Sequence, residues 1–234
     1  SDLPVLTYHE RDGAPYITSG IFLACDPETG VPNLSFHRSM VISDTELRIR
    51  LGSSHDLAHY QLAAERQGKA LEAAILIGAP PEVFISACVS LPPQANELAL
   101  AAAIRGGPLR TRRCQTINLS VPAATDIVIE GRILPNVRRP EGPFGEFMGY
   151  YVEVGENHVF EVTHVSWRKG AIFHGLICGS DEDLRPLEAA TAARIYRAIK
   201  GQVPGIIDVS CKPTVMNTVI KLRKQYEGHG QHAL

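Results

Sequence analysis

Short apolar segments separated by turn-forming residues make up most of the chain. They are rich in Val, Ile, Leu, Phe and Tyr, and stretches such as 26–30 (Asp-Pro-Glu-Thr-Gly) interrupt them. Short apolar segments bounded by turn-forming residues are typical of β-strands. The pattern predicts strands at 16–24, 33–41, 46–51, 71–78, 116–121, 127–133, 150–154, 159–168, 171–177, 206–211 and 215–223.

Four other segments have a helical pattern. In the first of them, Leu57, Tyr60 and Ala64 recur at helical spacing, and Gly68 follows as a stop. Helices are predicted at 55–67, 80–89, 97–104 and 181–200. Many strands interrupted by a few helices indicate an α+β protein, and we expect a β-barrel with helical insertions.

Composition narrows the class of protein. The 234 residues are 44% hydrophobic and 21% charged, which is ordinary for a globular protein that forms a sizeable core. There are no repeats and no linker, so a single domain over residues 1–234 is the simplest expectation. The formal net charge of −2 gives no reason to expect nucleic acid as a partner, and no apolar run is long enough to span a membrane. The five cysteines are scattered and never in CxxC spacing, which favours reduced thiols in the cytoplasm over disulfides or a zinc site.

The segment 140–151, Pro-Glu-Gly-Pro-Phe-Gly-Glu-Phe-Met-Gly-Tyr-Tyr, carries two carboxylates, Glu141 and Glu146, among closely spaced Gly and Pro residues. Such a run predicts a shaped loop, neither helix interior nor central strand. Two carboxylates held by a stiff loop suit general acid/base chemistry, because neighbouring like charges push one pKa upward. The alternative is a solvated surface turn, but clustered aromatic side chains and Met148 are unusual in exposed turns.

A second group of polar residues suggests a metal site. An amide oxygen from Asn33, an imidazole from His55 and a carboxylate from Glu97 would suit Mn²⁺ or Mg²⁺. Spacing does not show that the three meet, and each has another explanation: a turn residue, a helix-start residue and a first-turn charge that complements the helix dipole. Arg38 could hold a carboxylate or phosphate bidentately, or it could be a surface arginine of a strand.

The segment 140–151 resembles the signature of the UbiD family, decarboxylases that use prenylated FMN. Further segments resemble that family in the same order along the chain. They are 26–30, the Asn-Leu-Ser-Phe-His-Arg run at 33–38, the glycine-bounded stretch 68–78 with its following Pro-Pro pair, and the Val-Pro-Ala-Ala-Thr-Asp-Ile-Val-Ile-Glu-Gly run at 121–131. The resemblance covers nearly the whole chain and implies an FMN-binding split β-barrel with helical insertions.

The resemblance also implies roles for individual residues. It implies that Asn33, His55 and Glu97 hold Mn²⁺ or Mg²⁺, which bridges to the flavin phosphate, and that His59 is the competitor for His55. It implies that Arg38, Glu141 and Glu146 form the catalytic network, with Glu146 as the acid/base. The implied cofactor-binding residues are Phe36, His37, Arg38, Ser54, His55, Cys88 and Val89, with K⁺ as a further ion.

The implied function is the reversible, non-oxidative decarboxylation of an aromatic or α,β-unsaturated carboxylic acid. Losing CO₂ from such an acid needs an electron sink, which a modified flavin supplies and no natural side chain does. Two other hypotheses are a non-catalytic flavin-binding or assembly module and a flavin reductase. The resemblance further implies that this is the central domain of a longer protein, that a flavin prenyltransferase supplies the cofactor, and that the protein forms a homo-oligomer.

Overall fold

The computed structural model describes residues 3–92 and 95–233. These residues form two compact units, the first of Ser1–Ala87 and Leu91–Gly179 and the second of Cys88–Ser90 and Ser180–Leu234. The expectation of a single domain over 1–234 stays a prediction, because compactness alone does not tell whether the units fold independently.

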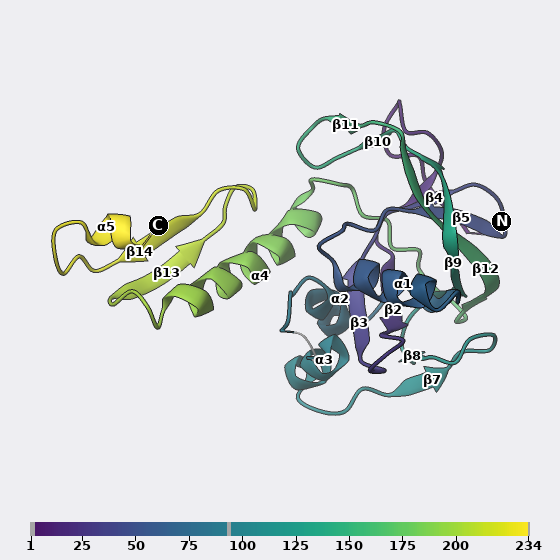
Figure 1. The fold of residues 1–234 in the computed structure, drawn as a ribbon, viewed down its shortest axis with the longest axis horizontal. Coiled ribbons are helices and arrows are strands. Elements are labelled where there is room, and N and C mark those ends of the chain that lie inside the picture. Colours follow the sequence, from purple (N-terminus) through teal and green to yellow (C-terminus); the bar gives the residue numbers. More distant parts are fainter. Residues whose placement is uncertain (1–2, 93–94, 234) are drawn as a thin grey trace. The chain divides into compact units, whose positions relative to one another are not determined.

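An eight-stranded antiparallel sheet forms the body of the first unit (Figure 1). Its spatial order is β1-β4-β5-β12-β9-β6-β2-β3. The strands are β1 (Tyr16–Ile17), β2 (Ile21–Cys25), β3 (Pro32–Phe36), β4 (Ser39–Val41), β5 (Glu46–Ile49), β6 (Leu71–Ile77), β9 (Ile127–Glu141) and β12 (Gly155–Trp167). The two longest, β9 and β12, lie side by side at the centre.

The two ends of this sheet are joined by very short connections. Strand β1 is at one edge of the sheet and β2 is the second strand from the other edge, yet only residues 18–20 separate them. Strand β3 is at that other edge and β4 lies next to β1, with only His37 and Arg38 between them in the chain. Because two or three residues span only about 10 Å, the sheet has to curl until its ends come close together. The two strands expected at 16–24 and 33–41 are therefore each divided into two.

Two hydrophobic cores cover the two faces of the curled sheet. Alternate residues of β6 show the division, since Ile75 and Ile77 belong to one core and Ala74 and Leu76 to the other. Helix α1 (Asp56–Arg66) packs on the first core through Leu57 and Ala64. Helices α2 (Pro81–Ala87) and α3 (Glu97–Arg105) pack on the second core.

Two small strand pairs complete the first unit. Strand β7 (Thr111–Arg113) pairs with β8 (Ser120–Pro122), where one strand at 116–121 was expected. Strand β10 (Phe144–Gly145) pairs with β11 (Tyr151–Val152). The segment 140–151 is therefore the end of β9 followed by a small hairpin, rather than a loop throughout. No strand forms at 171–177, so that expectation was wrong.

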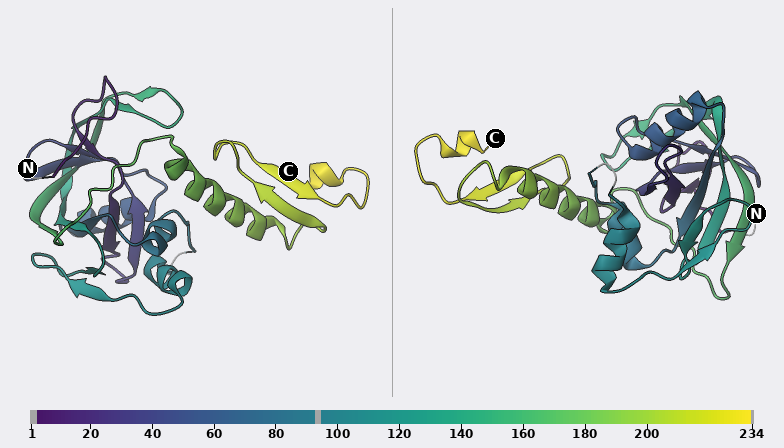
Figure 2. Two further views of the ribbon diagram at one scale, coloured as in Figure 1. Left: turned by 180° about the vertical axis from the view of Figure 1, so that it is seen from behind. Right: turned by 60° about the horizontal axis from the view of Figure 1, so that its bottom comes forward.

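The second unit consists of one long helix, a hairpin and a short helix (Figure 2). Helix α4 (Asp181–Ile199) begins at Ser180, whose side chain accepts a hydrogen bond from the amide of Asp183. It contacts β13 (Ile206–Ser210), which pairs with β14 (Val219–Leu222) before α5 (His229–His232). Its bounds agree closely with the helix predicted at 181–200.

The α+β class is confirmed, with a curled antiparallel sheet and few helices. Within the described part of the chain, no helix combines the length and apolar character needed to cross a membrane.

Candidate active site

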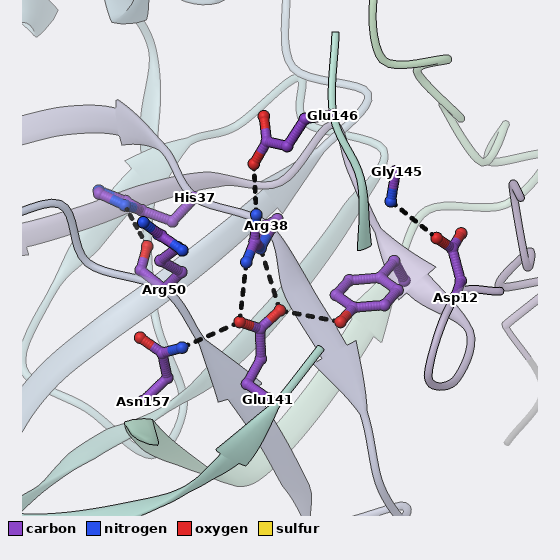
Figure 3. Close-up of polar contacts among 9 residues, drawn as sticks. Asp12, His37, Arg38, Arg50, Glu141, Gly145, Glu146 and Asn157 are labelled. Atoms are coloured by element: carbon purple, nitrogen blue, oxygen red, sulfur yellow. Dashed lines mark hydrogen bonds and ion pairs between the residues drawn. The ribbon is translucent and has the colours of Figure 1, made fainter. Parts of the chain in front are cut away.

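The arginine at the junction between the two sheet ends binds both carboxylates of the segment 140–151 (Figure 3). Arg38 donates from Nε and Nη2 to the two oxygens of Glu141, each at 3.0 Å. Its Nη1 donates to Oε1 of Glu146, which approaches from the opposite side. The three residues expected to form the catalytic network therefore lie in direct contact.

The two carboxylates differ sharply in exposure. The side chain of Glu141, the last residue of β9, is 0% exposed, whereas that of Glu146 is 34% exposed. Glu146 follows β10 at the turn of the hairpin, where its amide donates to the carbonyl of Tyr150. One carboxylate is therefore sealed in the protein, and the other lies where a small molecule can reach it.

Glu141 has two further partners that the sequence did not point out. The hydroxyl of Tyr16 donates to Oε1 at 2.8 Å, and Nδ2 of Asn157 donates to Oε2 at 3.0 Å. Burial, followed by the charge of Glu141, raises the pKa of the Tyr16 hydroxyl. Each oxygen of Glu141 thus accepts two hydrogen bonds, which is an arrangement for an ionised carboxylate.

The hairpin that carries Glu146 is fixed from the N-terminal segment. The buried carboxylate of Asp12 accepts a hydrogen bond from the amide of Gly145 at 3.0 Å, and it also accepts from the amides of Tyr8 and His9. Phe144 lies under the guanidinium of Arg38, 5.0 Å from its ring centroid. The position and orientation of Glu146 are therefore set by Asp12 on one side and Arg38 on the other.

The structure brings part of the expected metal site together. Asn33 is buried in β3, and the amide of the next residue, Leu34, donates to Oε2 of Glu97 at 3.1 Å. Strand β3 contacts α3, whose first turn contains Glu97, and α1, whose N-cap is His55. His55 is exposed and its side chain does not cap the helix, so its imidazole is available as a ligand.

The chemistry of this donor set fits a divalent cation. Glu97 is 3% exposed, burial raises its pKa, and none of the ion pairs among the described residues involves it. A buried carboxylate without a cation is costly, and Mn²⁺ or Mg²⁺ would neutralise it. Among the residues described, no three of the His, Cys, Asp and Glu type cluster for metal binding, but the expected set contains only two of that type, since its third member is Asn33.

The remaining residues expected at the cofactor lie in different surroundings. Phe36 is on β3, and its ring packs at 4.9 Å, centroid to centroid, against Phe84 of α2. Both ring nitrogens of His37 are engaged within the chain, with the hydroxyl of Ser35 and the carbonyl of Arg50.

Burial, followed by the proximity of His55, lowers the pKa of His37 to about 3, so this side chain is neutral. Ser54 is exposed just before α1. Cys88 and Val89 belong to the segment 88–90, which is part of the second unit. Burial, followed by Asp183, raises the pKa of the Cys88 thiol to about 12.

Three comparisons with known proteins agree with one another. The chain matches the UbiD family, described as the 3-octaprenyl-4-hydroxybenzoate carboxy-lyase Rift-related domain, over residues 1–181. It is 37% identical to the anhydromevalonate phosphate decarboxylase of Methanothermobacter thermautotrophicus over 100% of this chain and 56% of that protein.

Solved structures give the same result. The UbiD-class enzyme HmfF from Pelotomaculum thermopropionicum, in an evolved dimeric form with prFMN, matches with a TM-score of 0.95 and 37% identity, covering 99% of this chain and 55% of that one. The 3,4-dihydroxybenzoic acid decarboxylase AroY of Klebsiella pneumoniae matches with a TM-score of 0.89 and 29% identity, covering 99% and 52%. The chain spans about half the length of these relatives.

Proposed function

The chain belongs to the UbiD family, and from this premise we propose that the protein is a prenylated-FMN-dependent decarboxylase, a carboxy-lyase acting reversibly on an aromatic or α,β-unsaturated acid. The observation that carries the proposal is the contact of Arg38 with both Glu141 and Glu146. A protein that only bound flavin would have no need of a carboxylate held by an arginine at the edge of a buried network.

The two carboxylates take different roles in this proposal. Glu146, which is partly exposed, exchanges a proton with the carbon that loses or gains the carboxyl group. Glu141 is sealed among hydrogen-bond donors and orients Arg38. Arg38 in turn orients Glu146 and offers a positive charge to the carboxylate of the substrate.

Asn33, His55 and Glu97 would hold Mn²⁺ or Mg²⁺, and Phe36, His37, Arg38, Ser54, Cys88 and Val89 would line the cofactor, with K⁺ as a further ion. His37 would contribute by packing, because both its ring nitrogens already have partners. When bound, prenylated FMN supplies the electron sink that decarboxylation at an unsaturated carbon requires. The protein supplies orientation and a proton.

Several finer points belong to the same proposal. The curled sheet would be the flavin-binding split barrel of the family, a flavin prenyltransferase would supply the cofactor, and the protein would be a homo-oligomer. The names of the relatives support a small-molecule acid as substrate, and one of those relatives is named for a phosphorylated compound. The described cysteines are reduced thiols, which is compatible with a cytoplasmic location.

The test begins with protein co-produced with a flavin prenyltransferase. We expect a bound flavin-like absorption and one Mn²⁺ per chain, both lost in Asn33→Ala. The loaded protein is then offered benzoic, cinnamic and 2-alkenoic acids, with and without a phosphate group, and CO₂ release is followed. Glu146→Gln should keep cofactor and metal but lose most of the turnover, whereas Glu153→Gln, at an exposed position near the same hairpin, should behave as the wild type.

The outcomes separate the rival functions. Flavin binding with undiminished turnover in Glu146→Gln would refute the acid/base role. Flavin binding with no turnover of any acid would favour a binding or assembly module, and oxidation of NADH with free flavin would favour a reductase.

A further inference from the structure

Glu141 is held by more groups than Arg38 alone. Its carboxylate is fully buried, and it accepts four hydrogen bonds, two from Arg38 and one each from Tyr16 and Asn157. The four bonds are 2.8 to 3.0 Å long and are divided equally between the two oxygens. With no solvent access, the loss of any donor cannot be made good by water.

The strand register brings Tyr16 and Asn157 to this carboxylate. Tyr16 in β1 pairs with Met40 of β4, two residues after Arg38. Asn157 in β12 pairs with Arg139 of β9, two residues before Glu141. Residues two apart in a strand share one face of a sheet, so Asn157 is a diagonal neighbour of Glu141, to which it donates. Tyr16 pairs with β4 just after Arg38, and its hydroxyl reaches Glu141 beside that arginine.

The orientation of Glu146 depends on Arg38, and the orientation of Arg38 depends on Glu141. Both Nε and Nη2 of Arg38 are committed to Glu141, and this leaves Nη1 for Glu146. If Glu141 loses the donor on one of its oxygens, the carboxylate can rotate, and the planar guanidinium has to rotate with it. Rotation of the guanidinium moves Nη1 away from its present position, and Nη1 is the donor that orients Glu146.

We propose that Tyr16 and Asn157 are positioning residues of the decarboxylase: by completing the hydrogen bonds of Glu141 they fix Arg38, and thereby the geometry of Glu146. This inference rests on the function proposed above. The raised pKa of Tyr16, caused first by burial, keeps its hydroxyl protonated and donating at every working pH.

The test compares Tyr16→Phe and Asn157→Ala with two matched controls. Tyr8→Phe removes a hydroxyl that packs against the same cluster as Tyr16 but has no hydrogen-bond partner among the described residues. Asn118→Ala removes an amide whose described contact is with the side chain of Arg113, away from Glu141.

The first readout needs neither cofactor nor activity. In ¹⁵N-labelled full chain without flavin, the Nε–H of Arg38, assigned by its loss in Arg38→Lys, should exchange slowly with water. We expect Tyr16→Phe and Asn157→Ala to speed this exchange by about tenfold, since local opening becomes easier. The two control variants should leave it unchanged.

The second readout uses the loaded enzyme. Misplacement of a catalytic group by about 1 Å costs up to about a hundredfold in rate, so we expect kcat to fall by about tenfold or more in Tyr16→Phe and Asn157→Ala. Flavin absorption and bound Mn²⁺ should match the wild type, because the proposed metal ligands are unchanged and Arg38 is displaced rather than removed.

Three results would overturn the inference. These are unchanged exchange at Arg38, unchanged kcat, or a joint loss of kcat, flavin and thermal stability, which would show a merely structural role. A wild-type protein inactive on every acid would overturn the proposed function instead, while the exchange measurement would still decide whether Tyr16 and Asn157 hold Arg38.

Discussion

Glu141 and Glu146 both pair with Arg38, but replacing each by Gln should change the free energy of unfolding by very different amounts. In Glu141→Gln, the new amide group has to face two of the four donors that now surround the carboxylate, and the guanidinium of Arg38 loses the buried one of its two anions. One-sided removal of a buried ion pair costs about 3–5 kcal/mol, whereas pairs near the surface are worth about 1 kcal/mol or less. Because the side chain of Glu146 is 34% exposed, Glu146→Gln should fall in the second class.

Trp167 makes this difference measurable. It is the single tryptophan of the chain and lies at the end of β12, which pairs with the strand that carries Glu141. Its fluorescence during urea unfolding therefore reports on the first unit. With a typical denaturant slope of about 2 kcal/mol per molar, Glu141→Gln should lower the midpoint by about 1.5 M or more, and Glu146→Gln by about 0.5 M at most. Equal shifts, or a larger one for Glu146→Gln, would refute the assignment of Glu141 as the buried anchor.

Three further predictions concern the support of the site and of the sheet. Asp12→Ala leaves three backbone amides without their acceptor and should cost about 1–3 kcal/mol of unfolding free energy, with a smaller loss in Asp12→Asn, as measured by urea titration. Gly131→Ala places a Cβ 2.1 Å from a backbone oxygen of the neighbouring central strand and should cost about 3 kcal/mol or more, whereas Gly107→Ala meets nothing within 4 Å and should change Tm little. Burial, followed by the charge of a nearby arginine, lowers the pKa of His158 to about 4, so between pH 6.5 and 4 the unfolded chain binds a proton that the folded chain does not. Stability should therefore fall as the pH falls through this range, by up to about 1.4 kcal/mol per pH unit, and the slope should be shallower in His158→Gln; parallel slopes would contradict it.

The sequence predicts those elements whose ends are set by neighbouring residues, and it misses those whose ends are set by contacts with distant parts of the chain. The helix predicted at 181–200 has an acidic start and a long periodic pattern, and its predicted bounds lie within one residue of the observed helix Asp181–Ile199. The strand expected at 33–41 was found as two, β3 and β4, because the break at residues 37–38 serves to connect opposite ends of the sheet. Nothing in the local pattern of Phe36 or Ser39 marks that change of partner, which only the tertiary fold decides.

The candidate site divides in the same way. Glu141 and Glu146 were recognisable because they lie in one unusual segment, and Arg38 because of its spacing from Asn33 within a resemblance that extends over the chain. Tyr16 and Asn157 were missed, since each lies in an ordinary strand and gains its importance only through cross-strand register. Register cannot be read from a single strand, so such supporting donors stay invisible until the sheet is assembled.

The position of Arg38 connects closure of the sheet to the proposed chemistry. The residue lies at one of the two short connections between the sheet ends, after β3 and before β4. Its partner Glu141 ends a central strand, and Tyr16 precedes the other short connection. The ion pair therefore joins the end of the sheet to its centre, and any change that opens the curl also separates Arg38 from Glu141. For this reason opening the sheet should also abolish the active arrangement of Glu146, whereas removing Glu146 should leave the sheet closed, because Glu146 itself contributes little to closure.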